Sequence, residues 1–228
     1  MYGKSTSVVV ALSIVFAAKT VYAADCVWIG GAEGAPSDWN TAANWRGGVP
    51  GRSDVAIFES GDWLITSSTS GDKYVSGIKV LSGNVYFSKS AMPIAFQKAY
   101  CPTGMLYVAE GATLCFSNFV SSGSATVSSQ AAVAKYGAGT LRFCNRIGYS
   151  SNVGECNFRP FIAAEGTTYF SPNPNQGGTF GFYGDLVVKD GAEVLSTQYS
   201  EMSSYTGVVT VERGGILTLS GGDAVSGY

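Results

Sequence analysis

The chain has 228 residues, 13% of them charged, a net charge of −2 and no histidine. This charge balance offers no basic patch for nucleic acid, and the missing histidine removes the usual general base, the Ser–His and Cys–His nucleophile pairs and the commonest zinc ligand. We therefore expect no nucleic-acid partner, no metal ion and no small-molecule cofactor, and the 30 glycines and 13% aromatic residues favour short strands and tight turns over helices.

Residues 1–23 are typical of a signal peptide that directs export. Lys4 precedes an apolar run over residues 7–18, and small residues at the end of the segment provide a cleavage site. The apolar run is about a dozen residues long, whereas a helix that crosses a bilayer needs ~20, so we favour a cleaved leader over a membrane anchor. A lipoprotein fits less well, because Asp25 stands before Cys26 where a small residue is needed.

Residues 24–72 form a tryptophan-rich segment that we expect to cap the N-terminal end of the fold. Four aromatic side chains are suited to cover the first apolar layer: Trp28, Trp39, Trp45 and Phe58. Asn44 and Asp54 are residue types that stabilise turns and cap backbone groups. We prefer this structural role over ligand binding by the tryptophans.

Residues 73–228 repeat one motif, in which apolar residues stand five and three positions before a glycine. The glycines lie at intervals of 23–29 residues and are Gly83, Gly111, Gly137, Gly166, Gly191 and Gly214. In the clearest copy, Leu106 and Val108 precede the glycine, and Leu114 and Phe116 follow it.

Some copies of the motif are irregular. The copy at Gly137 has only Ala132 and Ala134 at the apolar positions, and it needs one extra residue to bring its second strand into line. Five positions after the glycine, several copies carry a serine instead of an apolar residue: Ser88, Ser171 and Ser196. We therefore expect the second strands to be less uniformly apolar than the first.

Each unit is predicted to be a strand, a glycine corner and a second strand, because strand side chains alternate with period two and glycine accepts positive φ. One unit cannot bury its apolar face alone, but stacked units would bury a continuous column. We therefore predict an all-β fold, a parallel β-helix (β-solenoid), over residues 73–228. The rival is an antiparallel sandwich, which does not explain a motif at these intervals. Outward ladder positions are expected at Lys79, Lys189, Thr210 and Glu212.

The sequence leaves the state of the cysteines open. The five residues are Cys26, Cys101, Cys115, Cys144 and Cys156. No pair has the C-x-x-C spacing of a redox or metal motif. Export would allow two disulfides with one thiol left over, whereas buried free thiols acting as small apolar side chains are an equally good interpretation.

Two segments resemble a known family. Residues 28–58 contain W-x-G, W, A-x-N-W, G-x-P and D-x-A-x-F in that order, and this segment resembles the N-terminal part of bacterial autotransporter-like passenger proteins. Residues 135–141, K-Y-G-A-G-T-L, are similar to the K-x-G-x-G-T-L core of the autotransporter-associated β-strand repeat.

The resemblance implies a right-handed parallel β-helix that is exported and displayed on the bacterial cell surface, in an adhesive or coat role. Such proteins usually continue for hundreds of residues and end in a translocator barrel or a sorting anchor. This chain stops at Tyr228 with neither, so we expect a solenoid that is incomplete at its C-terminus and an outer-membrane anchor as continuation or partner. Open strand edges at that end would need a cap.

Two alternatives to a structural role deserve weight. A carbohydrate-binding module would use exposed aromatic rings, but the 13 tyrosines are spread along the chain, and we expect core packing and ladder stacking to account for most of them. A polysaccharide-degrading β-helix enzyme would need paired carboxylates, for which Glu110, Glu165 and Asp190 at equivalent corners are the candidates. A column of them could also bind Ca²⁺.

Acidic residues directly before a corner glycine are ordinary turn chemistry, so we assign no catalytic, cofactor-binding or metal-binding residue. The sequence predicts a secreted or cell-surface, adhesin-like and non-catalytic solenoid. Its partners would be glycans or the surface of a host or neighbouring cell.

Overall fold

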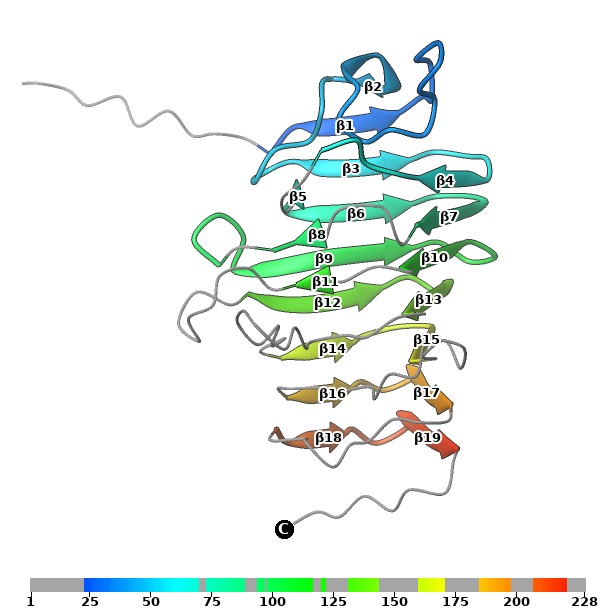
Figure 1. Ribbon diagram of the computed structural model, residues 1–228. Helices are drawn as coiled ribbons and strands as arrows, with labels where there is room; N and C mark the ends of the chain where they lie inside the picture. Colours follow the sequence, from blue (N-terminus) through cyan, green and yellow to red (C-terminus); the bar gives the residue numbers. More distant parts are fainter. Residues whose placement is uncertain are drawn as a thin grey trace, which may run out of the picture.

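The computed structural model of the chain describes residues 23–69, 73–88, 94–96, 98–116, 120–121, 131–143, 160–170, 185–197 and 207–220. These residues form a nearly all-β structure, in which coils stack into a β-solenoid (Figure 1). Apart from Ala23, the predicted signal peptide lies outside the described residues. Within the described part of the chain, no helix is long and apolar enough to cross a membrane.

The coils form two long sheets and one short sheet. The nine-stranded sheet contains β1 (Asp25–Trp28), β2 (Trp45–Arg46), β3 (Val55–Phe58), β6 (Gly77–Val80), β9 (Thr103–Val108), β12 (Ala132–Tyr136), β14 (Phe161–Ala163), β16 (Leu186–Val188) and β18 (Val209–Val211). The seven-stranded sheet contains β4 (Trp63–Ile65), β7 (Asn84–Phe87), β10 (Thr113–Phe116), β13 (Thr140–Phe143), β15 (Thr167–Phe170), β17 (Glu193–Thr197) and β19 (Ile216–Ser220). The three-stranded sheet contains β5 (Lys73–Tyr74), β8 (Ile94–Ala95) and β11 (Val120–Ser121).

The strand pairing confirms the solenoid and shows that the antiparallel sandwich is wrong. Every strand pair between the described elements is parallel except β1 with β2. The stack already includes β3 and β4, which lie in the segment expected to cap the fold.

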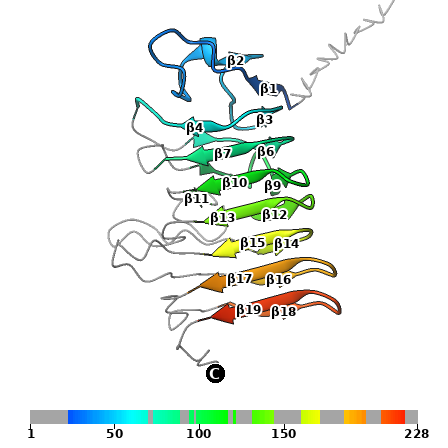
Figure 2. The same cartoon turned by 90° about the vertical axis from the view of Figure 1, so that its right-hand side faces the viewer.

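The corners are made by glycines, as the repeat predicts. Figure 2 shows that, from β3 onward, each strand of the nine-stranded sheet turns into a strand of the seven-stranded sheet in the same coil. Gly83 and Gly137 have φ of 78° and 80°, and a Cβ on either would lie 2.2 Å from a carbonyl oxygen of the preceding coil. Glycine is therefore required at these corners both for its backbone conformation and for the close approach of the coils.

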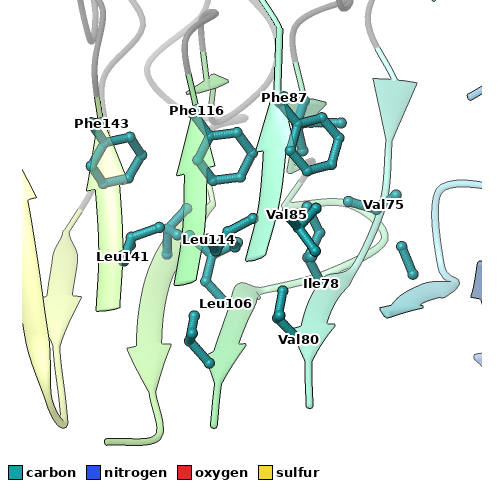
Figure 3. Close-up of a cluster of buried hydrophobic side chains, with 14 of the residues drawn as sticks. Val75, Ile78, Val80, Val85, Phe87, Leu106, Leu114, Phe116, Leu141 and Phe143 are labelled. Carbon is teal, nitrogen blue, oxygen red and sulfur yellow. The ribbon is translucent and has the colours of Figure 1, made fainter. Parts of the chain in front are cut away.

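The column between the two large sheets is the hydrophobic core. The predicted apolar pairs before the corners, such as Ile78 with Val80 and Leu106 with Val108, are fully buried (Figure 3). On the other side, four phenylalanines stack along the axis with centroid separations of 5.0, 5.7 and 5.4 Å: Phe87, Phe116, Phe143 and Phe170. Each coil thus covers the aromatic ring of its neighbour.

The inward serine predicted on the second strand is confirmed for Ser196, which is buried and pairs with Phe170 and Leu219, but not for Ser88. Ser88 does not face the column, because Phe87 pairs with Phe116 at that position. Phe170 likewise takes the inward position expected for Ser171, a residue outside the described part of the chain. The error arises because the corners differ in length, so the first inward residue follows the glycine by two, three or four positions in different coils.

The predicted register of the first strand at Gly137 is wrong by one residue. Val133 and Lys135 face the column in place of Ala132 and Ala134, since Lys135 pairs with Leu106 in β9 and with Ala163 in β14. The extra residue after this corner is confirmed, because Leu141 and Phe143 align with Leu114 and Phe116. A lysine therefore occupies a core position.

The predicted aromatic cap is confirmed at the N-terminal end of the column. Trp45 lies between Trp28 and Trp39, with ring centroids 4.8 and 4.7 Å away, and all three indoles are buried. Trp28 also contacts Phe58, and Trp39 contacts Phe87, so the cap continues into the phenylalanine stack.

Polar residues fold the capping segment around these rings. Asn44, in the short 3-10 helix η1 (Ala42–Asn44), is fully buried; its amide accepts from Ala32 N and donates to two carbonyls. Asp54 accepts from the backbone N–H groups of Ala24 and Gly51. The turn and capping roles predicted for Asn44 and Asp54 are confirmed.

Asp38 is a further anchor of this segment. Burial alone would raise the pKa of its carboxyl group, but hydrogen bonds from Ser68, Thr41 and Asn40 outweigh burial and lower the pKa to about 2. Asp38 therefore joins the cap loop to the segment after β4 in its ionised form.

The described cysteines are buried. Cys26 and Cys101 are free thiols, and burial raises the pKa of each. Cys115 is also buried, in β10. Cys144 and Cys156 lie outside the described residues.

Candidate functional site

Of the three corner carboxylates considered for catalysis or Ca²⁺ binding, Glu165 and Asp190 lie against a neighbouring corner. Glu165 accepts from Gly137 N at 2.7 Å, and Asp190 lies against the corner at Gly214, where a Cβ would be 2.0 Å from its Oδ1. Glu110 is exposed at the corner of its own coil. In the described part of the chain, no group of three or more His, Cys, Asp or Glu residues could hold a metal ion.

The most unusual polar group is the Lys135 ammonium, which is fully buried. Its Nζ donates to the carbonyl oxygens of Gly137 at 2.5 Å, Gly139 at 2.6 Å and Glu165 at 2.6 Å. Two of these carbonyls belong to its own corner and one to the corner of the next coil. Lys135 therefore joins two successive corners through backbone oxygens.

The electrostatic environment of Lys135 follows from this position. Burial lowers its pKa to about 8, and the nearby Glu165 carboxylate opposes that shift. The ammonium supplies a donor to each of three converging carbonyls, which satisfies both the charge and the backbone. We interpret this arrangement as structural, because all of its described partners are backbone oxygens.

The K-Y-G-A-G-T-L segment now has a physical explanation. Lys135 ties the corner, Gly137 provides the positive φ, and Gly139 allows a close approach, since a Cβ there would lie 2.1 Å from Ala109 O. Thr140 then faces outward and Leu141 faces the column. Sequence analysis includes Lys135 as the first residue of the K-Y-G-A-G-T-L motif but does not predict that it is buried, although the extra residue after Gly137 is a signal that this corner is built differently.

The described tyrosines lie outside the core, which corrects the expectation that core packing accounts for many of them. None of the described tyrosines belongs to the buried core, whose aromatic residues are phenylalanine and tryptophan. Three tyrosines are clearly exposed: Tyr86 at 42%, Tyr100 at 50% and Tyr136 at 39%. Tyr107 and Tyr136 occupy directly paired positions on the outer face of the nine-stranded sheet.

The other predicted ladder positions also lie on the surface. Lys79, Lys189, Thr210 and Glu212 are all partly or fully exposed. Lys189 and Glu212 form an ion pair between successive coils. Such an exposed pair contributes little to stability, about 0–1 kcal/mol.

The outer face of the seven-stranded sheet carries a mixed aromatic and cationic ladder. The register places Tyr86, Cys115, Arg142 and Tyr169 side by side on successive strands. Arg142 is exposed, and its guanidinium carbon lies 4.4 Å from the centroid of the Tyr169 ring. We call these four residues the outer ladder.

A row of threonines runs beside the outer ladder. Thr113, Thr140 and Thr167 pair directly with one another on the same outer face, and all three are half-buried. This face combines rings, hydroxyl groups and one cation, which makes it the best candidate binding surface in the described part of the chain.

Comparison with known proteins adds no identification. No protein-family model, no curated protein and no solved structure matches this chain.

Proposed function

We propose that the protein is an exported, non-catalytic structural element of a bacterial cell surface, with an adhesive role. The observation that carries the proposal is the division between the inside and the outside of the solenoid. Apart from Lys135, Thr168 and Ser196, the described column holds aliphatic and aromatic side chains, whereas tyrosine, arginine and other threonines lie on the outer faces. A rigid rod with such faces is suited to contact other surfaces.

The polar groups of the corners support the non-catalytic part of this proposal. Lys135, Glu165 and Asp190 bind or contact the backbone of neighbouring corners, and no other use of them is needed to explain their positions. The signal-like N-terminal sequence and the resemblance to passenger proteins support export.

Surface labelling tests the location. Antibodies raised against refolded residues 24–228 should label intact cells that produce the protein, at a level close to that of permeabilised cells. Label that reaches the protein only after permeabilisation would overturn the proposed location.

Bead adhesion tests the role. Beads coated with the same protein should bind cells or extracellular polysaccharide films more strongly than albumin-coated beads. Equal binding by both kinds of bead would contradict adhesion. Release of reducing sugars or unsaturated products from pectic or alginate polymers would contradict the non-catalytic assignment.

Carbohydrate binding is the second candidate, and a specific observation favours it. The exposed tyrosines offer aromatic surface outside the core, which packing does not explain. Changes in tryptophan fluorescence during glycan titrations would report binding near the cap, where Trp63 is partly buried.

A further inference from the structure

From the geometry of the outer ladder, we propose that this face binds an extended polysaccharide bearing spaced carboxylates, with Arg142 as the residue that pairs with them. The inference rests on the proposed surface role and names a ligand class for it. It starts from the position of Arg142 in the middle of the seven-stranded sheet, between β10 and β15.

Among the residues that the structure describes, Arg142 is a cation without an acidic partner. Among the described residues, the ion pairs involve Arg46 and Lys189 and leave out Arg142. Its contact is with the ring of Tyr169, which restrains the guanidinium and leaves N–H groups for another ligand. A carboxylate is the group that such a planar fork binds best, through two parallel hydrogen bonds.

The surroundings of Arg142 offer hydroxyl groups for a sugar. Thr140 lies two residues before it on the same outward side of β13, and Thr113 and Thr167 flank Thr140 on the neighbouring strands. Successive strands are about 4.8 Å apart, so the threonines form a regular row along the axis. Thr167 is also within 3.5 Å of the Glu193 carboxylate, which marks the far end of this row.

The distance between Tyr86 and Arg142 gives the minimum length of a ligand that contacts both residues. Tyr86 lies two strands from Arg142 on the same ladder, about 10 Å away at 4.8 Å per strand, and it is 42% exposed. On the next strand Leu64 is 56% exposed. One sugar ring cannot reach both Arg142 and this apolar end, whereas a polymer along the axis would pass over the buried Cys115 and contact both.

The single cation and the hydroxyl groups of the face favour a uronic-acid polymer over nucleic acid. Nucleic-acid binding needs several cations that neutralise successive phosphates, and the outer ladder presents one. A uronic-acid polymer, with hydroxyl groups between its carboxylates, fits one arginine among threonines and tyrosines.

The test is affinity gel electrophoresis of the mature chain in gels that contain polygalacturonate or its fully methyl-esterified form. We expect polygalacturonate to retard the protein and esterification to remove most of the retardation. The Arg142→Gln variant should weaken binding roughly tenfold or more, as expected for loss of a charge-assisted hydrogen-bonded pair. Lys79→Gln removes the same charge from the outer face of the other sheet and should change binding less than about twofold.

The controls separate this proposal from its rivals. Tyr86→Ala should weaken binding to the polymer, and Tyr136→Ala, on the opposite sheet, should leave it unchanged. Absence of retardation by polygalacturonate, or equal behaviour of Arg142→Gln and Lys79→Gln, would overturn the proposal. If galacturonic acid or inorganic sulfate at equal charge concentration competes as well as the polymer, the face is a simple anion site and the polymer proposal is wrong.

The failure of this site and the failure of the surface role are distinguishable. If coated beads adhere but Arg142→Gln binds polygalacturonate as well as the wild type does, the binding site is refuted and the surface role stands. If the beads do not adhere but Arg142→Gln abolishes binding to polygalacturonate, the binding site stands and the adhesive role is refuted.

Discussion

Replacement of Lys135 by methionine is the most informative single change in the core. Methionine keeps an unbranched chain but removes the donor to three carbonyl oxygens. Gly139 O keeps a hydrogen bond from Thr167 N, so the carbonyls of Gly137 and Glu165 lose the donor that the structure shows for them. Leaving a buried carbonyl unpaired costs about 1–3 kcal/mol.

The expected loss of stability follows from these two groups. Two unpaired carbonyls, at about 1–3 kcal/mol each, give an expected loss of about 2–6 kcal/mol. At about 2–4 °C per kcal/mol for a domain of this size, the melting temperature should fall by roughly 4–24 °C. The loss should begin at the corner, so amide exchange at Gly137 and Gly139 should accelerate more than exchange in the cap.

Urea denaturation followed by circular dichroism, with hydrogen exchange for the corner, provides the assay. Lys79→Met is the matched control, because Lys79 lies on the outer face of the same sheet and its loss should change stability by less than about 0.5 kcal/mol. The reasoning is refuted if Lys135→Met and Lys79→Met have the same stability, since the three hydrogen bonds would then contribute nothing.

Three further outcomes are expected. The pKa of Lys135 is about 8 in the native state and near 10.5 in the unfolded state, so between these pH values the unfolded state binds more protons than the native state. The stability of the wild-type protein, relative to that of Lys135→Met, should therefore rise with pH in denaturation series at pH 8, 9 and 10. The pKa of Asp38 is about 2, so the stability that its carboxylate provides is present above about pH 4 and is lost as the pH falls through 2. Asp38→Asn should be less stable than the wild type at pH 7, and its melting temperature should fall less than that of the wild type when the pH is lowered. Phe116→Ala should destabilise the fold by about 3–5 kcal/mol in urea titrations, because Phe116 stacks on Phe87 and Phe143, whereas Tyr86→Ala on the outer face should cost much less.

The repeat could be predicted from the sequence because it depends on backbone chemistry. A glycine after an apolar–x–apolar pair requires a strand and a corner, whatever the exact register, and the intervals then imply stacking. The aromatic cap could also be predicted from the sequence. Trp28, Trp39 and Trp45 are large apolar side chains, and the open apolar end of a small β fold is the site that can bury all three.

The register could not be predicted, because each corner absorbs a different number of residues. A register shift of one residue moves every side chain of a strand to the opposite face of the sheet. For this reason the repeat pattern wrongly predicts Ser88 inside the column and Lys135 outside it. Hydrophobicity alone cannot correct the second error, since it never places a lysine in a core. Only the three carbonyls that converge in space explain why this core position accepts a cation.

The candidate binding surface was hidden for a related reason. Composition counts tyrosine with phenylalanine, but in the described coils phenylalanine faces the column and tyrosine faces outward. The outer ladder is therefore visible only once the alternation of Phe170 with Tyr169 is known.

The parallel stacking also determines how the molecule responds to force. Hydrogen bonds between coils point along the solenoid axis. A force that pulls the two ends apart therefore acts on the hydrogen bonds of the terminal coil first and breaks them before those of the next coil. Each detached coil would release the 23–29 residues between successive corner glycines, or roughly 80–100 Å of extended chain. A tether built this way lengthens in steps under tension and dissipates mechanical work before it breaks.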